Sequence, residues 1–242
     1  MKNFNITILF FIVLFLLFSC SEPAENNSYN SKDLKKDPVL KDVSYSKEFT
    51  TPGNYFWVVP GNIKGNITVT IIAGGGGGGG SGYTPEMLFF GGGGGGAGQM
   101  LIDIGNIEVT KDEIILVTVG NGGSGAIYYG NIGGDGENSS ITTANASYVA
   151  VAGSGGNLGY NVYKGGAGYP SGQDSSIFIG GNGGNNGRGF GQGGEGESIP
   201  ALSAPVNSGG GGGGSGSGRG NDMYPAGNGG SGYARIDYTV LE

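Results

Sequence analysis

The chain has few of the residues on which catalysis and metal binding commonly depend. Its 242 residues include no histidine and a single cysteine, Cys20. Without histidine, the commonest general base and the commonest transition-metal ligand are missing. One thiol allows neither an internal disulfide nor a zinc site built from several cysteines. We therefore predict that the protein is not an enzyme, that it has no catalytic or metal-binding residues, and that it uses no cofactor.

Charge is also scarce. Charged residues make up 13% of the chain, about half the usual share of roughly 25%. The 12 basic residues are scattered and the net charge is −7, which argues against nucleic acid as a partner. The 58 glycines and 9 prolines would suit a disordered low-complexity chain. Against disorder stand 36% hydrophobic residues, 10% aromatic residues and several segments that alternate like β-strands.

The N-terminal region has the pattern of an export signal. An apolar run over residues 6–18, interrupted only by Thr7, follows a short basic start. At about 13 residues it is too short for a membrane span, which needs about 20, and it suits the core of a signal peptide. Cys20 stands at its end. Leu17-Phe18-Ser19-Cys20 resembles the lipobox of bacterial lipoproteins, although Phe18 departs from the usual residue at that position.

That resemblance implies that Cys20 becomes the lipidated N-terminus and carries palmitate. We expect a signal peptide at 1–19, a flexible tether at 20–42 and one glycine-rich domain at 43–242. The protein would be lipid-anchored in a bacterial cell envelope, at the outer membrane or the cell surface. A plain secretory signal with a chance cysteine, or an uncleaved signal anchor, are the alternatives.

Three uninterrupted glycine tracts lie at 74–80, 91–96 and 209–214. Glycine loses more conformational freedom on folding than any other residue, so a folded protein keeps such runs where a side chain would not fit. Polyproline-II helices packed side by side offer that setting, with three residues per turn and backbone groups that must pair outside the helix. Elsewhere many segments follow a Gly-Gly-x pattern, in which one position in three can point outward. We predict a packed bundle of polyglycine-II helices.

The remaining segments predict an all-β fold, a small antiparallel sheet or sandwich, with no substantial α-helix outside the signal peptide. In residues 65–73 alternate positions are apolar, and so are those of 233–240. We expect Met100, Ile102 and Ile104 to face inward together. Residues 113–119 are apolar on both faces, which indicates a strand covered on both sides. Shorter strands are predicted at 139–143 and 148–152.

A family resemblance rests on three segments. Residues 49–61 read FTTPGNYFWVVPG, residues 67–77 continue a strand into four glycines, and residues 228–236 read NGGSGYARI. Together they resemble the glycine-rich domain of phage tail-tip adhesins and of many bacterial surface proteins, over about 43–242. The extracellular glycine-rich region of anaplastic-lymphoma-type receptor kinases is similar in packing. The resemblance implies a small β-sheet base from which polyglycine-II helices project, with receptor-binding loops at their far ends.

The residues between glycine segments are aromatic or apolar, and they are our candidates for ligand contact. These are Tyr83, Met87, Phe89, Phe90, Tyr128, Tyr129, Tyr163, Tyr169, Leu202, Met223 and Tyr224. The alternative is that these rings pack on the sheet or clamp the helices.

The function that follows is adhesion or recognition without catalysis. The partners expected are a membrane, through the lipid anchor, and a glycan or surface protein; the oligomeric state is open. A structural spacer or envelope scaffold with no specific ligand is the alternative, and ice binding is a third hypothesis that thermal hysteresis would test.

Overall fold

The computed structural model describes residues 39–83, 89–127, 130–159, 164–176, 179–192, 200–217 and 224–242. Within it, Leu40–Glu242 forms one compact unit. The described residues contain no helix, and the predicted all-β class is confirmed. The strands are β1 Asp42–Phe49, β2 Gly53–Val58, β3 Ile67–Ile72, β4 Gly82–Tyr83, β5 Phe89–Phe90, β6 Met100–Ile107, β7 Ile114–Val119, β8 Ser139–Thr142, β9 Ser147–Ala150 and β10 Tyr233–Leu241.

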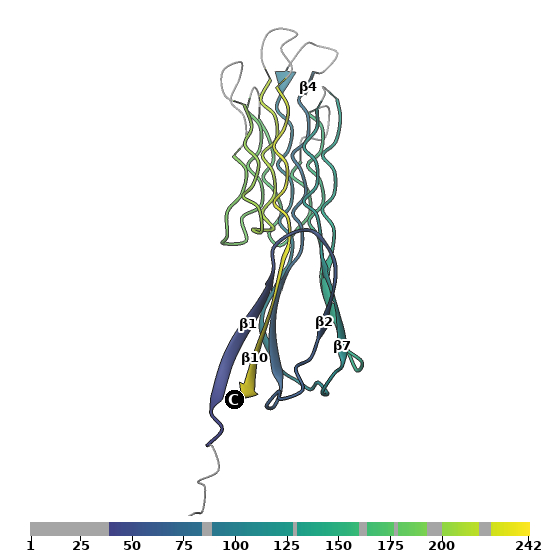
Figure 1. Ribbon diagram of the computed structural model, residues 1–242. Coiled ribbons are helices and arrows are strands. Elements are labelled where there is room, and N and C mark those ends of the chain that lie inside the picture. Colours follow the sequence, from purple (N-terminus) through teal and green to yellow (C-terminus); the bar gives the residue numbers. More distant parts are fainter. Residues whose placement is uncertain are drawn as a thin grey trace, which may run out of the picture. The chain divides into compact units, whose positions relative to one another are not determined.

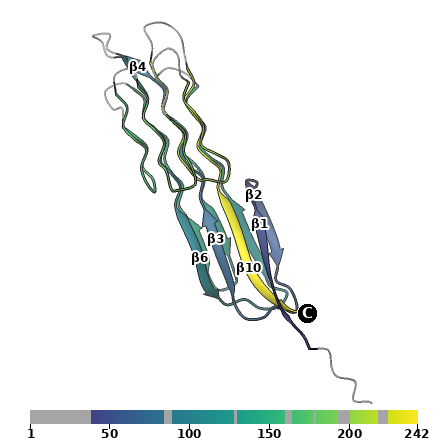
Figure 2. The same cartoon turned by 90° about the vertical axis from the view of Figure 1, so that its left-hand side faces the viewer.

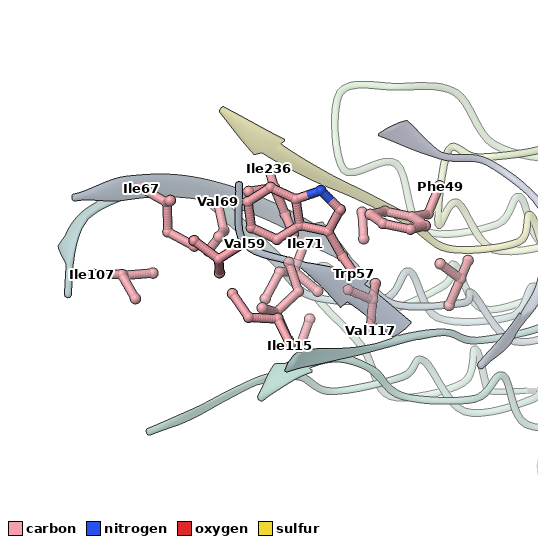
Figure 3. Packing of buried hydrophobic residues seen from close by; sticks show 14 of the residues in the cluster. Phe49, Trp57, Val59, Ile67, Val69, Ile71, Ile107, Ile115, Val117 and Ile236 are labelled. Carbon is pink, nitrogen blue, oxygen red and sulfur yellow. The ribbon is translucent and has the colours of Figure 1, made fainter. Parts of the chain in front are cut away.

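Two antiparallel four-stranded sheets form a sandwich at one end of this unit (Figure 1). The first sheet has the order β1-β10-β3-β6 and the second the order β2-β7-β8-β9. Apolar side chains from both sheets meet between them, with Ile71 and Ile236 on one side and Ile115 on the other (Figure 3). Trp57, the single tryptophan, packs into the same core. Burial of these side chains is the main contribution to stability at this end of the unit.

The strands predicted from simple alternation have the predicted faces. Ile67, Val69 and Ile71 of β3 are all fully buried. On β10, Ile236 is fully buried while Arg235 and Asp237 form an ion pair outside. Period-two alternation therefore identified the buried face in both strands.

The predicted inward face of β6 is wrong at Ile102 and right at Ile104. Ile102 is 54% exposed, whereas Leu101 and Ile104 pack against the core. The register explains the difference, because Ile71 pairs with Leu101 and Val69 with Ile104. Between these pairs, Thr70 of β3 opposes two residues of β6, Ile102 and Asp103. Such a β-bulge turns every following side chain to the other face.

The bulges of β6 are marked by left-handed backbone. Asp103 has φ 50° and Asn106 has φ 59°, and each lies at an irregularity of the register with β3. Asp and Asn tolerate this region better than other side-chain-bearing residues. The Thr70 hydroxyl donates to the carboxylate of Asp103 and also accepts from its backbone N–H, which holds the first bulge in place.

The prediction that 113–119 is covered on both faces is also wrong. In β7, Ile115 and Val117 are fully buried, but Ile114 is 61% exposed and Leu116 is 37% exposed. Within Leu40–Glu242, the outer face of the second sheet lies uncovered.

The glycine segments continue directly from the strands and run away from the sandwich (Figures 1 and 2). Chains leave the sheets after β3, β7 and β9, and chains return into β6, β8 and β10. The strands fix where these six segments leave or enter the sandwich, and so set the register of these six beside one another.

Hydrogen bonds of the first tract, residues 74–80, repeat every three residues. Its N–H groups donate in rotation to three neighbouring segments, at 2.8 to 2.9 Å. In order from Gly74, the accepting carbonyls belong to Glu137, Gly230, Gly96, Gly134, Gly227, Gly93 and Asn131. The carbonyls of the same tract accept, again in rotation, from segments 153–159, 123–126 and 212–215. A repeat of three is the period of polyglycine II.

Each uninterrupted tract thus lies inside the bundle with neighbours on every side. The second and third tracts, together with the residues that directly follow them, 97–98 and 215, also bond to six segments each. A side chain has no room there: a Cβ added to Gly77 would lie 2.1 Å from the backbone oxygen of Ser124. The uninterrupted glycine runs mark the interior of the lattice.

Outer segments lack a neighbour on one side, and polar side chains take over its role. The N–H of Gly125 donates to Asn228 Oδ1 at 2.7 Å, and that of Gly155 donates to Asp135 Oδ1 at 2.8 Å. These Asn and Asp residues occupy the outward position of the Gly-Gly-x pattern. They satisfy amides that would otherwise need water.

Candidate functional site at the distal end of the bundle

The distal end is the end of the bundle away from the sandwich. The hydrogen bonds that define it involve the residues just after the first tract: Gly159 donates to Gly80 and Gly130 donates to Ser81, at 2.9 and 3.0 Å. Beyond them, β4 and β5 pair as a two-residue ladder, with Tyr83 opposite Phe89. Several turns of the chain therefore start and end at this level.

Four of the predicted contact residues are described next to these turns. Phe90 and Tyr224 are described, are partly buried and adjoin the distal turns, and both have interaction partners. For Tyr83 and Phe89 the backbone alone is described. Met87, Tyr128, Tyr129, Tyr163 and Met223 lie outside the described residues, as does Cys20.

Two predicted residues lie elsewhere. Tyr169, 52% exposed, donates its backbone N–H to the carbonyl of Ala97, just before β6, and so lies at the sandwich end of the bundle. Leu202, also 52% exposed, accepts from the amide of Gly213 within the third tract, on the side of the bundle. The structure does not bring these two side chains to the distal end.

Three exposed isoleucines at the distal turns were not among the sequence candidates. Ile127 and Ile132 flank residues 128–129 and are 65% and 64% exposed, and Ile179 follows residues 177–178 at 46% exposure. Among the described residues near the distal turns, Lys164 and Asp174 are charged. The sequence offers one signal for these isoleucines, a β-branched residue directly beside a glycine segment. Such a side chain cannot enter the lattice and must stay outside it.

Acidic groups nearer the sandwich have structural partners. Glu137 accepts hydrogen bonds from the backbone amide and from the side-chain amide of Asn121. Both lower the pKa of its carboxyl, the backbone hydrogen bond more than the side-chain one. Glu113 accepts from the amides of Ala144 and Thr110, which likewise lower its pKa. Each carboxylate closes a turn or joins two segments by hydrogen bonds.

A pocket of about 310 Å³ opens beside the turn between β1 and β2. Its lining includes Lys47, Phe49, Tyr55 and Phe56. The rings of Phe49 and Tyr55 are in contact, with centroids 5.2 Å apart, and the Tyr55 hydroxyl donates to the carbonyl of Thr51. These contacts stabilise the turn. In the described ranges, no three His, Cys, Asp or Glu side chains gather as a metal site would require.

Fold and distal end together define an all-β protein in which a sandwich supports a hydrogen-bonded bundle of glycine chains. The chain belongs to the glycine-rich domain family, whose family model matches residues 50–239. None of the curated proteins compared with the chain matches its sequence. In the part of the chain that the structure describes, there is no helix of the length and hydrophobicity needed to cross a bilayer.

Proposed function

We propose that this is a lipid-anchored protein of a bacterial cell envelope, at the outer membrane or the cell surface. Its glycine-rich domain acts in adhesion or recognition and does not catalyse a reaction. Lipidation at Cys20 supplies the membrane anchor, and the distal end meets a glycan or a protein on another surface.

The observation that carries the proposal is the opposite placement of the two ends of the unit Leu40–Glu242. β1 starts at Asp42, and the carboxyl end of its partner β10 lies beside it, since Asp42 pairs with Leu241. Both therefore lie at the sandwich end, far from the distal turns (Figure 2). A tether entering before residue 42 leaves the distal end pointing away from its attachment.

The composition of the distal end supports recognition. Ile127, Ile132 and Ile179 are exposed beside turns that also contain tyrosine, phenylalanine and methionine. Apolar side chains gathered at one exposed end favour a binding surface. The lattice behind them holds this end rigidly, which limits the conformational entropy lost on binding.

The experiment compares distal and basal substitutions of exposed residues. Ile132→Ser and Ile127→Ser should weaken binding of the purified chain to a glycan or surface-protein array by about tenfold or more. Tyr169→Ser is the matched control, because Tyr169 is exposed to a similar degree at the sandwich end. Equal loss of binding in the control, or no loss in either distal variant, contradicts recognition by the distal end.

A structural spacer is the second candidate. The continuous hydrogen-bonded lattice favours it, because rigidity alone would suffice for a spacer. A spacer would bind nothing on the array. Truncation of the bundle would then change the phenotype of the cells, whereas the distal substitutions would not.

A further inference from the structure

The outer face of the second sheet is an uncovered apolar surface, called here the β2–β7 face. Phe56 lies opposite Leu116, and Val58 opposite Ile114, in neighbouring strands. Their exposed fractions are 75%, 37%, 55% and 61% in that order. Val149, on β9 at the other edge of the sheet, is 44% exposed. Large apolar side chains therefore lie on β2 and β7 and again on β9, with Ser140 and Thr142 of β8 between them.

The polar residues of this face are uncharged, and four of them pair with one another. The Thr118 hydroxyl donates to Asn54 Oδ1 at 2.8 Å, and the hydroxyls of Thr142 and Ser147 lie 2.9 Å apart. Burying these groups against another surface would leave no charge without a partner and few polar atoms to desolvate.

The outer face of the first sheet is different. There Arg235 forms ion pairs with Asp103 and Asp237, and the Ser46 hydroxyl donates to Asp237. An unpartnered sheet face normally carries such polar and charged groups towards water. The two faces of the sandwich thus have the compositions of a solvent-exposed surface and of an interface.

We infer that the β2–β7 face binds the same face of a second copy of this chain. A chain of net charge −7 repels its own copies, and this face brings no like charges together. The contact would be isologous, as in most homodimers, with one sheet stacked on the other.

The exposed area is sufficient for such a contact. A fully exposed large side chain presents roughly 150–200 Å². Multiplied by the exposed fractions of the five apolar residues, this gives roughly 500 Å² of apolar surface per copy. Two copies would cover about 1,000 Å², and the Thr, Ser and Asn residues between them add to this. That total reaches the lower range of specific protein interfaces.

The first test identifies the occupant in intact cells. The full chain carries the photo-crosslinking residue p-benzoylphenylalanine in place of Phe56, or in place of Ile102 as a control on the first sheet. Ile102 is 54% exposed, on β6. We expect an adduct of twice the monomer mass from position 56 alone, with both crosslinked peptides from this chain. An adduct with another protein or with lipid, or equal yields from both positions, would overturn the inference.

The second test measures the association directly. The full chain in detergent should sediment as a dimer, and Ile114→Glu should raise the dissociation constant at least tenfold, because each copy would bury a glutamate against an apolar surface. Ile102→Glu makes the same change at nearly the same exposure on the other sheet, and should leave the constant unchanged. Thermal unfolding of both variants checks that they fold alike. A monomeric wild-type chain, or equal weakening by the two substitutions, would refute the contact.

Discussion

Gly77→Ala tests the lattice with the smallest possible side chain. Gly77 lies in the middle of the first tract, where an added Cβ would be 2.1 Å from the oxygen and 2.3 Å from the carbon of the Ser124 carbonyl. Real Cβ atoms do not approach backbone that closely, and backbone cannot rotate away as a side chain can. The segment containing Ser124 must therefore move outward.

The magnitude follows from the hydrogen bonds that this movement stretches. Gly123 and Ala126 donate to carbonyls of the first tract, and the Ser124 carbonyl accepts from Gly134, at 2.8 to 3.0 Å. With about 0.5–1.5 kcal/mol of net stability in each bond, the loss is about 2–4 kcal/mol. For a domain of this size, the expected fall in melting temperature is roughly 5–15 °C.

The assay uses two signals, circular dichroism for the glycine chains and the fluorescence of Trp57, the single tryptophan, for the sandwich core. Gly105→Ala is the control, because its Cβ would meet Thr68 Oγ1 at 3.4 Å, an ordinary contact. Gly53 is a poorer control, since its φ of 148° would itself strain a substituted residue. A melting temperature of Gly77→Ala within about 1 °C of Gly105→Ala would refute the packed lattice.

Further predictions concern the lipid anchor, the loss of stability at acidic pH and the edge of the lattice. Cys20→Ser should leave the protein unlipidated, so that it no longer fractionates with membranes as the wild type does; unchanged fractionation contradicts the lipoprotein proposal. Glu113→Gln should destabilise the protein at neutral pH, because hydrogen bonds to the carboxylate lower its pKa. Its contribution is present above the ordinary pKa of 4.5 and is lost as the pH falls through the lower folded value, so the stability gap between variant and wild type should narrow as the pH is lowered below 4.5; a gap that does not narrow contradicts the mechanism. Asn228→Ala removes the acceptor of one outer amide, that of Gly125, and should lower the free energy of unfolding by about 0.5–1.5 kcal/mol, well below the effect of Gly77→Ala.

The sandwich was predictable wherever the chain alternates without interruption. β3 and β10 fit because a regular strand places every second side chain on the core face. The inward and outward faces of β6 were not predictable in this way, because Asp103 and Asn106 are each an extra residue, in left-handed backbone, that interrupts the alternation. The sequence Asp-Ile-Gly-Asn at 103–106 contains residue types that tolerate positive φ, so a bulge was a readable alternative there.

The exposed face of β7 was mistaken for a second core face for a different reason. Apolar residues on both sides of a strand predict that something covers both sides, and they do not say whether the cover belongs to the same chain. Ile114 and Leu116 lie uncovered within Leu40–Glu242. The pattern and the exposure agree if a second molecule supplies the cover.

The end of the bundle at which a turn lies depends on whether the segment before it runs away from the sheets or towards them. Amino-acid composition does not encode that direction. A glycine segment running away from the sheets looks the same in sequence as one returning. The segment 152–159 leaves the sandwich and the one starting at Lys164 returns to it, so the turn at Tyr169 must lie at the base. Alternating the direction of successive segments from the end of β3 onwards assigns each turn to one end. Applied to the sequence, that rule separates Tyr169 from the aromatic residues of the distal turns.

Whether a segment is pure glycine and which segments become its neighbours have different physical causes. A segment inside the lattice needs all three sides of its turn for other backbones, so it admits no side chain, and a pure glycine run identifies it. A segment at the edge keeps one side open and tolerates Asn, Asp or Ser there. Which segments become neighbours is another matter, because an N–H···O bond between two glycines is the same for any pair. The sandwich fixes part of this choice, because β3, β7 and β9 release their segments, and β6, β8 and β10 receive theirs, at set positions. The third tract and the segment 179–184 beside it connect to no strand directly, and their hydrogen bonds to the other segments place them. Substitutions in the sandwich core should therefore disorder glycine segments that they do not touch, and first those that continue from a strand.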